Sequence, residues 1–135
     1  MPTGTIPQVG AVISLTKQIS DADVALFTLV ATDQPPTPEE PAKPEPPGPT
    51  LVPGALVAAL LAAAAAQHAG GLAAATLTRA EISCAASAQT DDTLTASAEV
   101  LAADAATGTL RVGVHCANQT GARLAEGVFE LRARG

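Results

Sequence analysis

The clearest pattern of apolar residues in the chain lies at 54–67, and it predicts one long helix. Alanine and leucine, which fill this stretch, are the strongest helix formers. Pro53 stands at its start, where a proline is tolerated, and Gly70 and Gly71 follow its end. Because the segment is apolar on every side, we expect the helix to be buried. The surrounding run 51–66 is too short and too rich in alanine to predict a membrane span.

A strand and a shorter helix are predicted ahead of this segment. Residues 9–19 alternate partly between apolar and polar, as a strand does. Ser20 and Asp23 then stand three residues apart, the spacing of a capping box, so we expect a helix over 21–31. A rough apolar face on this helix is formed by Val24, Phe27, Leu29 and Val30.

Four segments after the long helix mix apolar or β-branched residues with polar ones and predict strands. They cover 72–86, 93–103, 109–117 and 123–132, with turn-forming residues between them at 89–92, 104–108 and 118–121. The last two joints are short, so we expect a C-terminal antiparallel meander. The whole order predicts an α+β domain in which a curved antiparallel sheet wraps around one long helix.

Composition restricts both the core and the partners. The chain of 135 residues fits one domain, and hydrophobic residues make up 47% of it. Since Trp and Tyr are absent, the core must be built from Leu, Val, Ile and Ala, with backbones lying close together. The net charge of -6, without any basic cluster, argues against a nucleic-acid partner.

The two cysteines, Cys84 and Cys116, lack the spacing of a metal site or a redox motif. We interpret both as buried thiols in a reducing compartment, with a structural disulfide as the alternative. The first residues show neither a basic segment nor an apolar one, so no secretory signal is expected. These features predict a cytoplasmic protein.

Prolines are concentrated between 35 and 53, where nine of the 11 occur, and no helix or inner strand tolerates this density. A linker between two domains is one interpretation, but the ~34 preceding residues are too few for an independent domain. We therefore expect a loop that crosses the surface inside a single domain spanning 1–135, with the character of a rigid polyproline-like flap. A proline-recognising partner is disfavoured, because no P-x-x-P register with a flanking arginine is present.

The order of these elements, with particular residues, resembles the MaoC-like hydratases of the hotdog fold. This family includes the (R)-specific enoyl-CoA hydratases and related 3-hydroxyacyl-thioester dehydratases. The resemblance covers 9–132 and is carried by Val9-Gly10, the helix start 20–27, Gly54-Ala55-Leu56, the turn 90–94, and 118–121 followed by Gly127. It implies a hotdog domain with an acyl-thioester site.

The family's active motif is G-D-x-N-P-x-H after the first helix, followed by H-G at the head of the central helix. In the family, the Asp and the His act as general base and acid on a water, and the Gly amide polarises the thioester carbonyl. This chain keeps Asp33 and Gly54. The changed positions are Thr32 for the first Gly, Pro35 for Asn, Pro38 for the catalytic His and Pro53 for the helix-head His.

Two interpretations of each retained residue stay open. Asp33 is either the general base or an ordinary loop acid ahead of a proline. Gly54, with the amide of Ala55, is either an oxyanion donor or a tight-turn residue before the helix. The donor role is favoured because it needs only backbone N–H groups.

No other residue is a good replacement for the missing histidine. His68 lies at the far end of the long helix, roughly 20 Å from Gly54 by helix rise, and we expect it to cap that helix. His115 is interpreted as a satisfied sheet histidine. Glu39 and Glu40 are interpreted as solvated loop charges. Losing a general acid or base lowers the rate ~10²–10⁴-fold, so we expect the catalytic activity to be very weak.

The resemblance therefore implies a degenerate hydratase. We expect a hotdog protein that binds acyl thioesters of coenzyme A or a carrier protein, with weak or no catalysis and no metal or further cofactor. It would form a homodimer, or a heterodimer with another hotdog subunit. The alternative is an active enoyl-CoA hydratase or dehydratase that uses Asp33 through a bound water.

Overall fold

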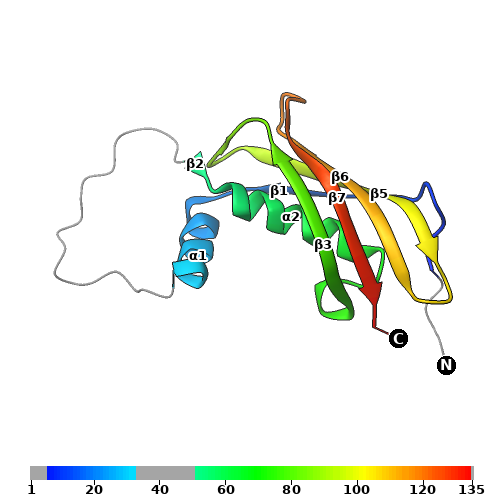
Figure 1. Ribbon diagram of the computed structural model, residues 1–135. Coiled ribbons are helices and arrows are strands. Elements are labelled where there is room, and N and C mark those ends of the chain that lie inside the picture. The colour runs from blue at the N-terminus through cyan, green and yellow to red at the C-terminus, as the bar shows by residue number, and fades with distance from the viewer. Residues whose placement is uncertain (1–5, 33–50, 135) are drawn as a thin grey trace, which may run out of the picture.

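Five antiparallel strands and one long helix make up most of the computed structural model, which describes residues 6–32 and 51–134 (Figure 1). The helices are α1 (Asp21–Thr32) and α2 (Gly54–Gln67), with the short helix η1 (Leu72–Ala74). The strands are β1 (Val12–Gln18), β2 (Leu51–Val52), β3 (Ala75–Cys84), β4 (Ala88–Gln89), β5 (Thr93–Asp104), β6 (Thr109–Ala117) and β7 (Arg123–Ala133). The large sheet has the order β1-β5-β6-β7-β3, which confirms the α+β architecture and the C-terminal meander.

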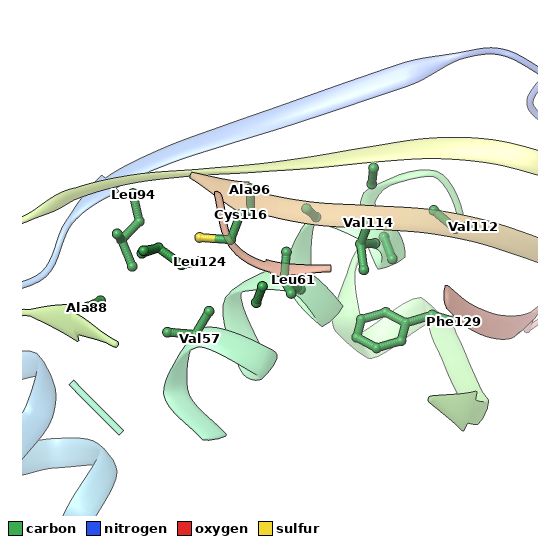
Figure 2. Packing of buried hydrophobic residues seen from close by; sticks show 14 of the residues in the cluster. Val57, Leu61, Ala88, Leu94, Ala96, Val112, Val114, Cys116, Leu124 and Phe129 are labelled. Atoms are coloured by element: carbon green, nitrogen blue, oxygen red, sulfur yellow. The ribbon is translucent and has the colours of Figure 1, made fainter. Parts of the chain in front are cut away.

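Helix α2 lies against one face of the sheet and forms the core with it (Figures 1 and 2). Its buried residues are Val57, Leu61, Ala64, Ala65 and Ala66. Opposite them are small or branched side chains of β5 and β6, joined by Phe129 of β7. The prediction of a buried central helix is confirmed, although Gly54 and Ala55 at its start are exposed. Neither α2 nor any other helix of the described residues is both long and apolar enough to cross a membrane.

The turn residues of the meander act as the sequence predicts. Asn118 Oδ1 accepts hydrogen bonds from the N–H groups of Thr120 and Ala122, at 3.0 and 3.1 Å. Gly121 follows with φ +85°, a conformation that glycine adopts without steric cost. These bonds reverse the chain between β6 and β7 and thereby fix the register of the meander.

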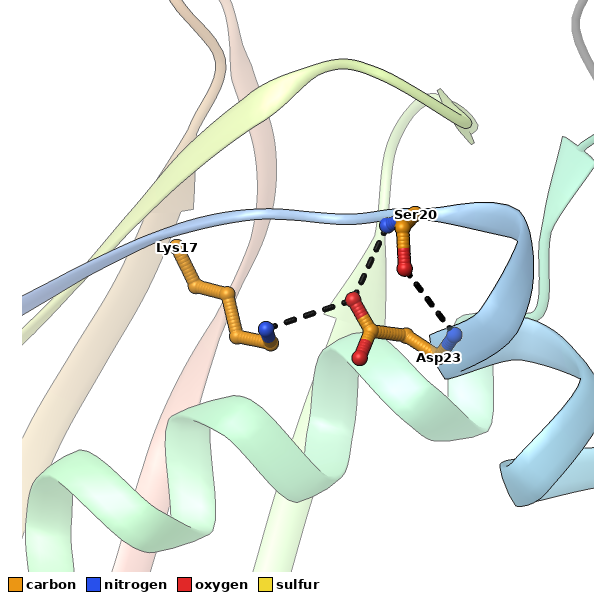
Figure 3. Close-up of polar contacts among 3 residues, drawn as sticks. All are labelled: Lys17, Ser20 and Asp23. Carbon is orange, nitrogen blue, oxygen red and sulfur yellow. Dashed lines mark hydrogen bonds and ion pairs between the residues drawn. The ribbon is translucent and has the colours of Figure 1, made fainter.

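Helix α1 begins with the predicted capping box (Figure 3). The Ser20 N–H donates to Asp23 Oδ2 at 2.9 Å, and the Asp23 N–H donates to Ser20 Oγ at 3.1 Å. Lys17 Nζ lies 3.2 Å from the same carboxylate. The bonds from Ser20, with a smaller contribution from Lys17, lower the pKa of Asp23.

The apolar side chains of α1 are less buried than the sequence predicts. Val24 packs against the core and Phe27 is half-buried, but Leu29 is 49% exposed and Val30 is 83% exposed. The expectation of one apolar face holds only for the turns nearest the sheet, because the helix projects away from the core beyond them (Figure 1).

Strand β3 forms an edge of the sheet and pairs on one side with β7. The predicted strand 72–86 is shorter in the structure, since its first three residues form η1. Opposite Ile82 lies Gly127, where an added Cβ atom would collide with the backbone carbonyl oxygen of Glu81. Only a glycine allows β3 and β7 to approach this closely.

Replacing Gly127 with alanine is therefore expected to destabilise the fold by roughly 1–3 kcal/mol, because backbone atoms must move to admit the methyl group. The matched control is Gly113→Ala. Its Cβ would meet only the side chain of Leu101, at 3.2 Å, and that side chain is 43% exposed and free to shift. The control should change stability by less than about 0.5 kcal/mol. Urea unfolding followed by far-UV circular dichroism measures both, and equal effects would contradict the close approach.

Candidate functional site

A cleft of about 190 Å³ lies where α2 begins. The two-stranded ribbon of β2 and β4 forms one side of it, through the pairing of Val52 with Ala88. The lining residues are Val52, Gly54, Val57, Cys84, Ala85, Ala86, Ser87, Ala88, Leu124 and Ala125. They are mostly small and apolar, and none of them carries a carboxylate or an imidazole.

Hydrogen bonds to two neighbouring segments hold the walls of this cleft. The N–H groups of Ala85 and Ala86 donate to the carbonyl of Leu124, at 2.8 and 3.2 Å. The Gln89 N–H donates to Asp92 Oδ2 at 2.8 Å, which anchors the end of β4. This bond and a second one from the Gln119 side chain lower the pKa of Asp92. The walls of the cleft are thus held in place by hydrogen bonds within the fold.

The start of α2 supplies the polar groups at the cleft. Pro53 is the N-cap residue and makes no side-chain cap bond, while its carbonyl accepts from the N–H groups of Leu56 and Val57. Within the described residues, the N–H groups of Gly54 and Ala55 have no such backbone acceptor. Unpaired N–H groups at a helix start carry a partial positive charge and favour a negatively polarised oxygen.

The two cysteines have opposite environments, and the prediction that both are buried is wrong for Cys84. Both are free thiols, and Cys116 is fully buried between β6 and α2, where burial raises its pKa to about 11. Cys84 is exposed because it ends an edge strand. Its Sγ atom would lie 3.6 Å from a Cβ placed on Gly54, so the thiol sits beside the helix start.

The predicted site residues are only partly within the described chain. Gly54 lines the cleft, whereas Ala55 lies next to it with its methyl group exposed. The position of Asp33 lies outside the described residues, and so do those of Pro38, Glu39, Glu40 and the loop 35–49. Their predicted roles therefore remain predictions.

Both histidines lie away from the cleft. His68 is the C-cap residue of α2, as predicted, and its backbone N–H donates to the carbonyl of Ala65 at 3.2 Å. Its imidazole Nε2 donates to the carbonyl of Ala98 in β5 at 2.9 Å. His115 is on the sheet face opposite α2, because its neighbour Cys116 is buried against the core. There it lines a separate depression of about 350 Å³ that also contains Glu99 and Glu126.

Apart from Gly54, the residues that line the cleft were not identified from the sequence as site residues, and among them are Cys84, Ser87 and Leu124. Their contribution depends on the pairing of β3 with β7, which brings 84–87 and Leu124 together. No local pattern marks this pairing. The run Cys84-Ala85-Ala86-Ser87 reads only as the end of a strand.

Solved structures with similar backbones define the class of fold. The chain is similar to an (R)-hydratase from A. caviae involved in PHA biosynthesis, with 24% identity and a TM-score of 0.75 over 96% of this chain and 99% of that one. The unliganded R-hydratase PhaJ1 from Pseudomonas aeruginosa is 23% identical, with a TM-score of 0.73 over 94% of this chain and 82% of that one.

A third structure has another described activity. It is a hypothetical thioesterase protein from Streptococcus pneumoniae, solved with coenzyme A, and it is 13% identical with a TM-score of 0.66 over 96% of this chain and 83% of that one. These likenesses establish that the chain has the hotdog fold. Neither a protein-family model nor a curated protein sequence matches the chain.

The environments of the two thiols predict different reactivity. In the folded protein, we expect a soluble disulfide reagent to modify Cys84 rapidly and Cys116 not at all, because Cys116 is buried and its pKa is raised to about 11. Unfolding in guanidinium should release a second reactive thiol. Titration with a chromogenic reagent measures both, with Cys84→Ser as the control. Rapid reaction of folded Cys84→Ser would show that Cys116 is accessible.

Proposed function

We propose that this protein is a MaoC-like hotdog protein that binds an acyl thioester at the Gly54 end of α2, with weak or no catalysis. The observation that carries this proposal is the cleft itself, which combines an apolar lining with the uncapped start of a helix. The ligand would be a thioester of coenzyme A or of a carrier protein. The hotdog fold, shared with hydratases and with a thioesterase solved with coenzyme A, supports this ligand class.

The cleft suits the reacting end of such a ligand. Val52, Val57 and Leu124 offer apolar surface to an acyl chain. The Gly54 amide would donate to the thioester carbonyl oxygen, an arrangement that resembles the helix-head contact of the hydratase family. Binding sites for small molecules usually have ~300–1,000 Å³, so a cleft of about 190 Å³ holds only part of the ligand.

The chemistry of the cleft favours binding over catalysis. Hydration of an enoyl thioester needs one group to take a proton and one to give it. None of the described residues that line the cleft is an acid or a histidine, and Pro38 and Pro53 replace both histidines of the family motif. Proline cannot move a proton, so the protein would hold its ligand without completing the reaction efficiently.

The second candidate is an active hydratase or dehydratase, and the retained Asp33 favours it. A single carboxylate can act through a bound water, at a cost of ~10²–10⁴-fold in rate for the missing partner. In either case we propose a cytoplasmic protein that works as a homodimer or as a heterodimer with another hotdog subunit. As the non-catalytic member of a heterodimer, it would support an intact hydratase.

The backbone donor at Gly54 can be removed without breaking the helix. Gly54→Pro deletes the N–H at the first helical position, where proline is well tolerated, and Pro53 already has the extended ψ of 137° that a residue before proline requires. We expect crotonyl-CoA to bind this variant about tenfold or more weakly, since the carbonyl oxygen loses its donor. Isothermal titration calorimetry measures the affinity.

Gly54→Ala is the matched control for this prediction. It keeps the N–H, and its methyl group would lie at ordinary contact distance, 3.6 Å, from the Cys84 sulfur. Its affinity should therefore stay near that of the wild type. Equal binding by wild type, Gly54→Pro and Gly54→Ala would refute the amide's role, and no binding by the wild type would refute the proposed ligand class.

Turnover separates the two candidate functions. We expect the purified protein to hydrate crotonyl-CoA slowly or not at all, at least ~10²-fold below an intact hydratase assayed in parallel, because one proton-transfer group is missing. Loss of the enoyl absorbance follows the reaction. Efficient turnover that Asp33→Asn abolishes would establish the active enzyme instead.

A further inference from the structure

The side chain of Asp92 joins two segments that lie far apart in the sequence. Its Oδ2 atom accepts a hydrogen bond from the Gln89 N–H at 2.8 Å, and its Oδ1 atom accepts one from Gln119 Nε2 at 3.0 Å. Gln119 Oε1 in turn accepts from the Thr93 N–H at 3.0 Å. These three bonds, which we call the Asp92–Gln119 bridge, link the end of β4 to the turn between β6 and β7 and to the start of β5.

The two sides of this bridge carry different walls of the cleft. Gln89 ends β4, where the neighbouring Ala88 is paired with Val52, and both of these residues line the cleft. Gln119 lies in the turn that leads into β7, and Leu124 of β7 is a lining residue that belongs to the large sheet. The bridge therefore connects a wall formed by the β2–β4 ribbon with a wall formed by the large sheet.

The ribbon of β2 and β4 needs such a connection because it is short. Each strand has two residues, and the pair forms a sheet of its own, separate from the five-stranded sheet. An isolated pair of strands is marginally stable at best in water. Val52 and Ala88 are buried, which fixes the inner face of the ribbon, and the bridge fixes the end that leads into β5.

The position of the ribbon also sets the position of the start of α2. Val52 is followed by Pro53 and then by Gly54, so the helix begins directly where β2 ends. On the wall formed by the large sheet, Cys84 ends β3, and its Sγ atom lies 3.6 Å from the place of a Cβ on Gly54. A displacement of the ribbon would therefore change the distance between the Gly54 amide and the opposite wall.

We propose that Asp92 and Gln119 are positioning residues of the cleft, and that their bridge fixes the separation of its two walls and thereby the place of the Gly54 amide. The role of these residues in ligand binding rests on the proposed function. The wall separation is a property of the chain alone, so it can be tested without a ligand as well.

The bridge has a direction that substitutions can reverse. A carboxylate only accepts hydrogen bonds, while a carboxamide has one accepting oxygen and one donating nitrogen. In Asp92→Asn two donating NH2 groups would meet, and in Gln119→Glu two carboxylates would meet. The double variant with both substitutions turns the middle bond around, and the N–H groups of Gln89 and Thr93 each keep an accepting oxygen. It also has the same net charge as the wild type.

Affinity for crotonyl-CoA tests the positioning role. We expect Asp92→Asn and Gln119→Glu each to bind about tenfold more weakly, because the wall separation is no longer fixed, and the double variant to bind within about twofold of the wild type. Isothermal titration calorimetry measures the affinity at a temperature where far-UV circular dichroism shows every variant to be folded. Gln119 is exposed, so its substitution leaves the core unchanged.

Asp91→Asn is the matched control for charge. It removes one negative charge from the neighbouring residue, whose backbone N–H donates to the carbonyl of Ile19 and whose backbone carbonyl accepts from Gln18 Nε2. Asparagine tolerates the positive φ of 75° at this position as well as aspartate does. The affinity of this variant should stay within about twofold of the wild type, which separates the loss of the bridge from the loss of a charge.

A disulfide across the cleft measures the wall separation without a ligand. Gly54→Cys places a second thiol beside Cys84, which is exposed and free. In a glutathione redox buffer the two thiols should close a disulfide, because a Cβ at residue 54 lies close enough to the Cys84 sulfur. Adding Asp92→Asn or Gln119→Glu should lower the equilibrium constant for closure about fivefold, and adding both should restore it. Intact mass after alkylation measures the closed fraction.

The two measurements together decide the role of the bridge. Weaker binding and weaker closure in both single variants, with recovery of both in the double variant, support the positioning role. Single variants that lose stability yet bind and close as the wild type does would show a merely structural bridge and overturn it. Additive losses in the double variant would contradict it as well. If the wild type binds no crotonyl-CoA, the proposed ligand class fails, and closure of the disulfide alone decides whether the bridge sets the walls.

Discussion

The contact between α2 and the sheet through small side chains is the constraint on which the rest of the structure depends. Ala64 and Ala65 of the helix are fully buried, as are Ala96 and Ala98 of β5. Side chains this short fill little volume, so the helix and the sheet must lie close together to exclude voids. The sheet meets this demand with a register shift in each of three strand pairings, since bulges increase twist and allow a sheet to bend. The core of this domain is therefore filled by the close approach of the helix and the sheet, with few aromatic side chains.

Local signals in the sequence were sufficient to predict most of the helices and strands. The composition of 54–67 predicted α2, Ser20 and Asp23 predicted the start of α1, and the polar turns predicted the meander. Features that depend on distant neighbours were missed. Leu29 and Val30 are exposed because α1 projects away from the core, and the His68 imidazole bonds to a strand carbonyl.

The residues of the candidate site likewise include some that the sequence predicted and some that it did not. Gly54 could be identified from the sequence because it stands next to a helix start and matches a family motif. Cys84 could not, because its exposure follows from the position of β3 at the edge of the sheet, and strand order is a property of the whole domain. Leu124 reaches the cleft only through the pairing of β3 with β7. Gly54, whose proposed role needs only its backbone N–H, was therefore predictable from the sequence, and the lining residues placed by strand pairing were not.

Because Pro53 makes no side-chain cap bond, binding of the proposed ligand at the cleft would be linked to the folding equilibrium. A capping side chain often satisfies the first N–H groups of a helix, and losing such a cap costs ~0.5–2 kcal/mol. In this chain a ligand oxygen would act as that cap, and it binds only when α2 is formed. Each increase in the free concentration of that ligand would therefore shift the equilibrium from unfolded to folded chains. A protein of this design would be longest-lived where its ligand is abundant, so its abundance in the cell would follow the supply of the molecule it binds.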